Sequence, residues 1–168
     1  MEANIHLRVP VDRDGSAVHA LISRCPPLDI NSVYCNLLQC SHFAATSVVA
    51  LQGAAVVGFI SAYRLPERTD TLFIWQVAVA GSVRGRGLAS DMLGHILGRS
   101  VCIGVGYLET TITADNKASW ALFTRLADRL EAKLDGRLLF DRQRHFSGHQ
   151  ASEQLVRIGP FPRYQTAP

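Results

Sequence analysis

The chain has little net charge and few cysteines. Its 17 lysines and arginines nearly balance its 14 acidic residues, which leaves a formal net charge of +3. No global field therefore favours a nucleic-acid or membrane partner, and any basic function has to be local. The four cysteines, Cys25, Cys35, Cys40 and Cys102, include no Cys-x-x-Cys pair. Together with His42 the first three match no common zinc pattern, so we expect small buried thiols and no metal.

Long apolar runs and a secretory leader are also missing. No run reaches the roughly 20 residues that span a bilayer, and the N-terminus "MEANIHLRVP" lacks the basic-then-apolar layout of a signal peptide. With unpaired cysteines, these absences predict a cytoplasmic protein. A chain of 168 residues that is 48% hydrophobic can bury one substantial core. We expect a single domain over residues 1–160 and a frayed tail over residues 161–168.

Apolar periodicity predicts a mixed order of strands and helices. Strands are expected over residues 5–9, 46–51, 54–65, 71–80, 106–112, 137–141 and 153–159, and helices over residues 88–97 and 117–130. A further helix, capped by Asp12 or Asp14, is expected to carry Val18, Leu21 and Ile22. The turn Gln52-Gly53 predicts an antiparallel hairpin. Between residues 25 and 43, two prolines end the first helix, and Asp29, Asn31 or Ser32 can open a short one. This order predicts an α+β fold that contains one strand-turn-helix-strand unit.

The turn after the strand at residues 71–80 has the composition of an anion site. Gly85 and Gly87 permit a tight backbone that exposes the unpaired N–H groups of the following helix, and Arg84 and Arg86 can add charge-assisted bonds to phosphate oxygens. The alternative is an ordinary connection with surface arginines. A Walker A loop is excluded because the Gly-Lys-Ser/Thr ending is absent. A dinucleotide fingerprint, with Glu109 as the ribose acid, is disfavoured because antiparallel strands precede the turn.

Two segments resemble the GCN5-related N-acetyltransferases (GNAT). "VAVAGSVRGRGLASDML" resembles motif A, whose signature is Gln/Arg-x-x-Gly-x-Gly/Ala at the end of a splayed fourth strand; Gly85 and Gly87 match, and Ser82 stands at the Gln/Arg position. "DNKASWALF" resembles motif B, in which Asn116 and Ser119 match. Phe123 stands where many relatives carry the tyrosine that protonates the departing thiolate.

This resemblance implies a fold, a co-substrate and a set of binding residues. The fold is a mixed, mostly antiparallel central sheet with splayed fourth and fifth strands, flanked by helices. Acetyl-CoA is the implied co-substrate, with no metal. The implied contacts are Val77, Ala78, Val79, Arg84, Gly85, Arg86, Gly87, Leu88, Ala89, Asn116, Ser119 and Phe123.

A narrower resemblance covers about residues 7–160. "CPPLDINSVYCNLLQCSHFAATS", "DTLFIWQVAV" and "FDRQRHFSGH" followed by "RIGP" are similar to the L-2,4-diaminobutyrate N-acetyltransferases of ectoine biosynthesis. The implied reaction is direct attack by the 4-amino group on acetyl-CoA in a ternary complex. Glu153 is the first candidate for the base and His149 the second. Candidate substrate contacts are Asp29, Asn31, Tyr34, Trp75 and Glu153.

Several alternatives remain open at this stage. Asp29 can be a helix cap, Glu153 a solvated charge and Trp75 a core residue. An acetyl-cysteine route has one weak candidate, Cys40 beside His42. Phe123 also suits a silent acetyl-CoA sensor, and another small amine, such as a polyamine or aminoglycoside, would use the same glycine turn. By analogy with the superfamily we expect a homodimer. The balanced charge and the short apolar runs predict no nucleic-acid or membrane partner.

Overall fold

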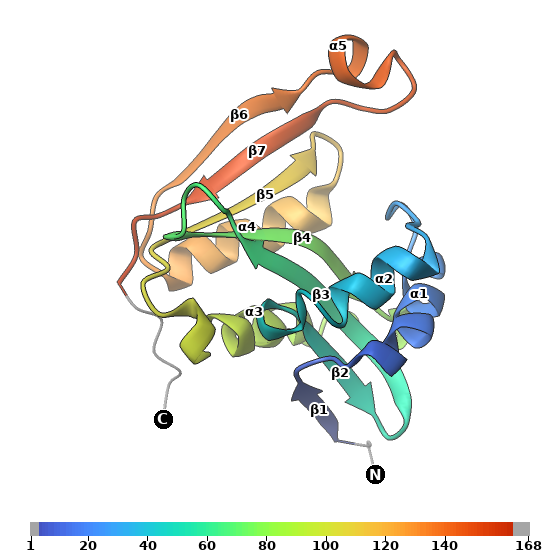
Figure 1. The fold of residues 1–168 in the computed structure, drawn as a ribbon. Coiled ribbons are helices and arrows are strands. Elements are labelled where there is room, and N and C mark those ends of the chain that lie inside the picture. Colours follow the sequence, from blue (N-terminus) through green and yellow to red (C-terminus); the bar gives the residue numbers. More distant parts are fainter. Residues whose placement is uncertain (1–3, 163–168) are drawn as a thin grey trace. The chain divides into compact units, whose positions relative to one another are not determined.

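The structure is a computed structural model that describes residues 4–162. Its strands are β1 (Ile5–Arg8), β2 (Val48–Gln52), β3 (Ala55–Arg64), β4 (Thr71–Val79), β5 (Tyr107–Thr113), β6 (Leu134–Phe140) and β7 (Glu153–Ile158). Its helices are α1 (Gly15–Ser23), α2 (Val33–Gln39), α3 (Leu88–Leu97), α4 (Lys117–Arg129) and α5 (Arg142–Phe146) (Figure 1). The strand order is β1-β2-β3-β4-β5-β7-β6. The expected α+β class with a mostly antiparallel sheet is confirmed.

The chain divides into two compact units. Within the described residues, unit 1 comprises residues 4–63 and 74–103, and unit 2 comprises residues 64–73 and 104–162. The boundary falls within β4, so most of that strand belongs to unit 1. The single domain over residues 1–160 stays a prediction, and most of the expected tail, residues 163–168, lies outside the described residues.

Unit 1 is built on an antiparallel meander with a helix on each face. β1 pairs with β2 and β2 with β3, both antiparallel. On one face, α1 residues pack with Phe59 of β3 and Ala78 of β4 in a cluster of buried side chains. On the other face, a Cβ atom added to Gly58 would lie 3.0 Å from the Met92 sulfur of α3. Glycine at position 58 therefore allows α3 to approach the sheet closely.

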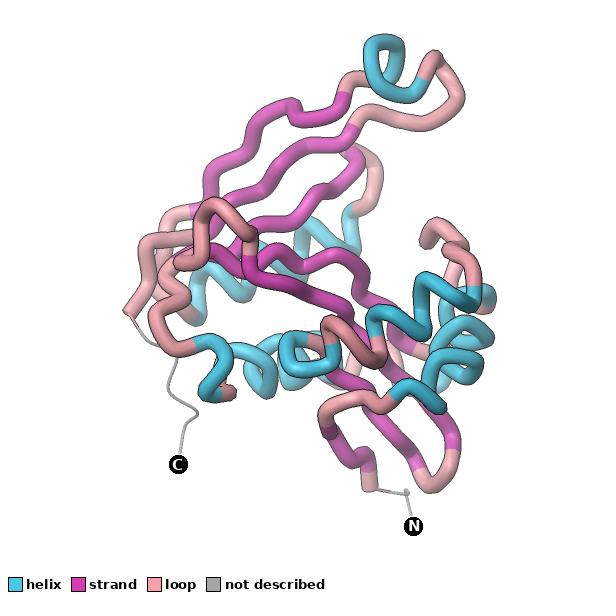
Figure 2. The backbone as a smooth tube through the Cα atoms, in the orientation of Figure 1, coloured by secondary structure: helices cyan, strands magenta, loops and turns pink. Residues whose placement is uncertain are grey.

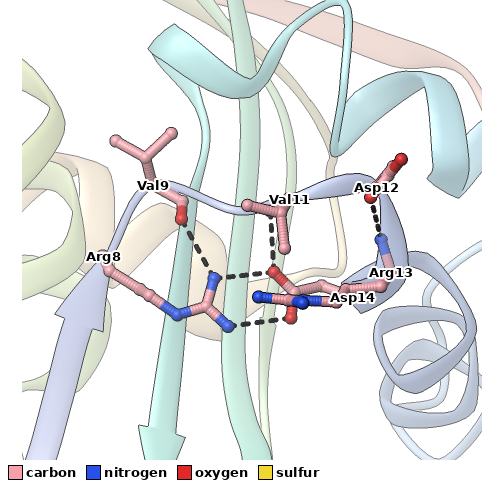
Figure 3. A network of polar contacts seen from close by, with 6 residues as sticks. All are labelled: Arg8, Val9, Val11, Asp12, Arg13 and Asp14. Carbon is pink, nitrogen blue, oxygen red and sulfur yellow. Dashed lines mark hydrogen bonds and ion pairs between the residues drawn. The ribbon is translucent and has the colours of Figure 1, made fainter.

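A polar network joins the end of β1 to the start of α1 (Figure 3). The Arg8 guanidinium donates two bonds to the Asp14 carboxylate, at 2.7 and 2.8 Å. The backbone N–H of Val11 donates to the same carboxylate at 2.8 Å. The hydrogen bond from Arg8 holds the pKa of Asp14 below its usual value, against the effect of burial. Asp14 is the N-cap residue of α1 but makes no side-chain capping bond, because its carboxylate is used in this network.

Unit 2 is an antiparallel three-stranded arrangement in which β7 lies between β5 and β6 (Figure 2). Glu109 of β5 is buried, and Arg68 donates to it at 2.7 and 3.0 Å. Arg157 of β7 donates to the same carboxylate and lies 3.9 Å from the Tyr107 ring centre. Burial alone would raise the pKa of Glu109, but the two arginines hold it below its usual value.

Two local details differ from the sequence predictions. The polar stretch between β6 and β7 contains a short helix, α5, capped by Asp141, whose carboxylate accepts from the N–H groups of Gln143 and Arg144. Strand β6 begins at Leu134, earlier than the expected residue 137. Pairing with β7 explains the longer strand, since Leu134 lies opposite Ile158.

Candidate functional site

The glycine turn connects β4 to α3 and leaves backbone donors exposed. Gly85 and Gly87 have φ of 75° and 79°, a region that disfavours side chains, and a Cβ at either would meet no atom within 4 Å. Gly87 is the N-cap of α3 and offers no side-chain cap. The first N–H groups of α3 therefore have no side-chain acceptor, and the positive end of the helix dipole faces an open turn. This backbone suits a phosphate group.

Two apolar side chains and one arginine hold this turn against the rest of unit 1. Val83 and Leu88, on either side of the glycines, are buried. The Nε of exposed Arg84 donates to the Val79 carbonyl oxygen at 3.0 Å. The same oxygen accepts a weaker bond from the Cys25 thiol at 3.5 Å. The turn is thus fixed in place while its glycines stay exposed.

The segment before α2 presents polar groups near the surface. Asp29 is exposed, Asn31 is half-buried, and the Tyr34 side chain is 69% exposed. The cap of α2 is Ser32, whose hydroxyl accepts from the Cys35 N–H at 3.1 Å. The alternative in which Asp29 serves as this cap is therefore wrong, because Ser32 occupies the capping position.

Trp75 lies in a group of three aromatic rings. Its ring centre is 6.4 Å from that of Phe43 and 6.2 Å from that of Tyr63, both in edge-to-face geometry. Trp75 is 43% exposed, so the alternative of an ordinary core residue is wrong. Burial raises the pKa of Tyr63, which keeps its phenol neutral. Aromatic rings held in this way can face an ammonium group.

Gln76 is a buried polar residue that the sequence reasoning missed. Its Nε2 donates to the Asp29 carbonyl oxygen at 3.0 Å, which joins β4 to the segment before α2. The signal was visible: one glutamine interrupts the otherwise apolar stretch "TLFIWQVAVA". Phe43 and Tyr63 were also missed, because nothing local in the sequence brings them beside Trp75.

Unit 2 holds the expected residues of the second motif, Asn116, Ser119 and Phe123, and the candidate bases Glu153 and His149. The Asn116 side chain caps α4 by accepting from the Ser119 N–H at 3.1 Å, so these two residues already have a structural role. The side chain of Phe123 is only 2% exposed and belongs to the core. Since phenylalanine has no transferable proton, this position cannot supply an acid.

The two candidate bases lie near each other in sequence at one end of the β5-β7-β6 arrangement. Half-buried Glu153 is the first residue of β7, opposite Thr113 of β5 and Phe140 of β6. His149 precedes it in an exposed turn, where its N–H donates to the Phe146 carbonyl.

Burial opposes the activation of two of the four thiols, Cys35 and Cys40, because it raises their pKa. Burial raises the pKa of Cys40 to about 12, so its thiolate is scarce near neutral pH. All four cysteines are free, and Cys25, Cys40 and Cys102 are buried. In the part of the chain that the structure describes, no group of three or more His, Cys, Asp or Glu residues could hold a metal ion. None of the described helices has the length and apolar character needed to cross a membrane.

Comparisons with known proteins identify the family. Residues 16–127 match the model of the acetyltransferase (GNAT) family. The chain is 53% identical to an L-2,4-diaminobutyric acid acetyltransferase from Methylotuvimicrobium alcaliphilum, over 96% of this chain and 94% of the relative. It is 50% identical to one from Bordetella parapertussis, over 93% of this chain and 84% of the relative.

A solved structure agrees with these relatives. Diaminobutyrate acetyltransferase EctA from Paenibacillus lautus, in complex with L-2,4-diaminobutyric acid and coenzyme A, matches with a TM-score of 0.92 and 36% identity. The match covers 98% of this chain and 99% of that one.

Proposed function

This chain belongs to the acetyltransferase (GNAT) family, and we propose that it transfers the acetyl group of acetyl-CoA to the 4-amino group of L-2,4-diaminobutyrate. The product is N4-acetyl-L-2,4-diaminobutyrate, an intermediate for ectoine biosynthesis. The observation that carries this proposal is the match over 98% of the chain to an enzyme solved with that amino acid and coenzyme A. Its 36% identity is well above the range in which only the fold is comparable.

The glycine turn fits the pyrophosphate of acetyl-CoA. Its exposed backbone donors and the cations of Arg84 and Arg86 offer hydrogen bonds and charge to phosphate oxygens. The motif A signature Gln/Arg-x-x-Gly-x-Gly/Ala can also be aligned so that it begins at Arg84, as Arg84-x-x-Gly87-x-Ala89. All three specified positions then match. In that alignment the glycine of the signature is Gly87, the N-cap of α3, whose backbone borders the exposed N–H groups of the helix.

Other residues extend this binding site in our proposal. The backbone of Val77, Ala78 and Val79 would pair with the pantetheine arm, although the Val79 carbonyl oxygen already accepts from Arg84 and Cys25. The remaining proposed contacts are Leu88, Ala89, Asn116, Ser119 and Phe123.

The charges of the amino acid match the proposed acceptor residues. Diaminobutyrate carries two ammonium groups and one carboxylate. Asp29 and Glu153 supply negative charge, Trp75 supplies a ring face, and Asn31 and Tyr34 supply an amide and a hydroxyl. The combination of these residue types, rather than any one of them, supports the assignment.

The proposed chemistry is direct transfer. An ammonium with a pKa of about 10 must lose a proton before it attacks. Glu153 is the proposed base that accepts this proton, and His149 is the alternative base. The nitrogen then bonds to the thioester carbonyl carbon while a backbone N–H near Val77 stabilises the oxyanion. The C–S bond breaks, and the thiolate takes a proton from a group other than Phe123 or from solvent. The raised pKa of Cys40 argues against an acetyl-cysteine intermediate.

Acceptor selectivity tests this function. The protein is mixed with acetyl-CoA and, separately, L-2,4-diaminobutyrate, ornithine, lysine or spermidine, and free thiol is followed. We expect release with diaminobutyrate, and NMR should place the acetyl group on the 4-nitrogen. Release with a different amine would contradict the acceptor assignment. Binding of acetyl-CoA with no release from any amine would favour a silent sensor, the alternative that Phe123 suggests.

The cellular compartment and the oligomeric state of the enzyme are part of the same proposal. We place it in the cytoplasm as a homodimer, since unpaired cysteines suit a reducing compartment and dimers are common among acetyltransferases of this superfamily. Sedimentation of the full chain measures its oligomeric state, and a monomer at micromolar concentration would contradict the dimer.

A further inference from the structure

Gln76 is a polar side chain at a core position of β4. Only 7% of the residue is exposed, and it lies between Trp75 and Val77 along the strand. Its Nε2 donates to the Asp29 carbonyl oxygen at 3.0 Å. Because a carbonyl oxygen can only accept, this bond requires the NH2 end of the carboxamide and fixes which way the amide points.

This bond is the main polar restraint on residues 29–31. Leu28 before the segment is held by the bond from its N–H to the Cys25 carbonyl, and Ser32 after it begins α2. Among the described residues, Gln76 provides the one hydrogen bond made by residues 29–31. The position of Asp29 and Asn31 therefore depends on a side chain from β4.

The oxygen of the Gln76 carboxamide indicates that this residue does not maximise the stability of the folded protein. Its Oε1 is buried and has no hydrogen-bond partner in the described part of the chain. Burying an unpaired carbonyl costs free energy, and an apolar side chain of similar size would avoid that cost. The Asp29 carbonyl belongs to an exposed residue, so water could satisfy it if Gln76 were absent. Costly polar residues of this kind are typical of functional sites.

We propose that Gln76 is a positioning residue for the amino acid acceptor: it holds residues 29–31 against β4 so that Asp29 and Asn31 meet the diamino acid. This inference rests on the proposed function. Gln76 acts through the segment and not on the acetyl donor. Its loss should therefore change the KM of the amino acid and leave that of acetyl-CoA unchanged.

The test compares Gln76→Met with a matched control, Gln39→Met. Gln39 of α2 is fully buried, and its Oε1 accepts from Asn36 at 2.8 Å, while its Nε2 has no partner within the described residues. Both substitutions remove a buried carboxamide of the same size. Only Gln76 contacts the segment at residues 29–31 through a hydrogen bond.

For Gln76→Met we expect a roughly tenfold higher KM for diaminobutyrate, the effect of about one lost hydrogen bond. The KM for acetyl-CoA should stay unchanged, and the midpoint of thermal unfolding should stay the same or rise. Gln39→Met should lower that midpoint, because Asn36 loses its buried partner, and leave both KM values unchanged. A merely structural role for Gln76 would instead lower the unfolding midpoint without separating the two KM values, which would overturn the proposal.

A second measurement does not depend on the reaction. The 15N relaxation order parameters of Ile30 and Asn31 should fall in Gln76→Met and stay at their wild-type values in Gln39→Met. Unchanged order parameters would overturn the positioning role even if the enzyme acetylates diaminobutyrate. If the wild-type protein acetylates no diaminobutyrate, the proposed function fails, and lower order parameters in Gln76→Met would still show that the segment depends on Gln76.

Discussion

Gly87 is the one residue of the glycine turn that combines a positive φ with the N-cap position of α3. Its backbone has a φ of 79°, and it is the N-cap of α3. The empty space around its Cβ position means that an alanine would strain the backbone without a steric clash. The residue therefore allows the effect of backbone geometry on ligand binding to be isolated.

Gly87→Ala should destabilise the fold by about 1–2 kcal/mol, the cost of a left-handed backbone for a residue with a Cβ, and raise the KM for acetyl-CoA. Gly53→Ala is the control, because Gly53 in the β2–β3 turn has a φ of 61° and equally open surroundings. Urea denaturation and initial rates measure both effects. An equal rise in KM for the two variants would contradict a specific role of the α3 N-terminus.

The reactivity of the Cys40 thiol is also determined at the residue scale, by its surroundings. Cys40 lies at the end of α2, where burial raises its pKa to about 12 and makes it a poor nucleophile. Sequence proximity to His42 had made it the one candidate for a covalent route. Burial, which the local sequence does not reveal, decides against that route.

At the scale of elements, α2 and the segment before it have distinct roles. Ser32 caps the helix, while Asp29 contributes its backbone carbonyl to Gln76 and keeps its carboxylate exposed. A short helix depends strongly on its cap, since few of its backbone bonds are internal.

Ser32→Ala should cost about 1 kcal/mol of stability through loss of the cap, with little change in kcat. Asp29→Ala should leave stability nearly unchanged and raise the KM for diaminobutyrate, because the carboxylate makes no capping bond. Chemical denaturation and steady-state kinetics distinguish the two. Loss of stability in Asp29→Ala without a kinetic effect would assign Asp29 to structure instead of substrate binding.

At the scale of the whole molecule, buried carboxylates determine how stability responds to acid. Arg8 lowers the pKa of Asp14, and Arg68 and Arg157 outweigh burial to lower that of Glu109. For such groups the folded-state pKa lies below the unfolded value. Their stabilisation is complete above about pH 4, where the unfolded carboxyls are ionised, and is lost as pH falls through the lower folded-state pKa.

The double variant Asp14→Asn with Glu109→Gln should be less stable than wild type at neutral pH and lose less stability on acidification. Asp135→Asn is the control, since Asp135 pairs with Lys133 at the surface, where their side chains are 59% and 74% exposed. Urea denaturation at several pH values gives both profiles. A double variant whose stability falls with acid as steeply as wild type would contradict this assignment.

Local patterns in the sequence determined most of the elements and the backbone of the glycine turn. Alternating and helical periodicities predicted the strands and the longer helices because burial on one face imposes them within a few residues. The two glycines and two arginines before α3 indicated an anion, since backbone geometry and helix-end donors are local properties. The composition of the stretch around Asp29 carried the resemblance that pointed to the acceptor.

Tertiary structure alone decided which distant side chains meet. Gln76 reaches Asp29 across 47 positions, and Arg68 and Arg157 reach Glu109 across 41 and 48. The Phe43, Tyr63 and Trp75 rings likewise come from a loop and two strands. Such contacts depend on how strands and loops pack, and many packings share the same local periodicity. The sequence by itself therefore determined the glycine turn, whereas the contact between Gln76 and Asp29 became visible only once the chain was folded.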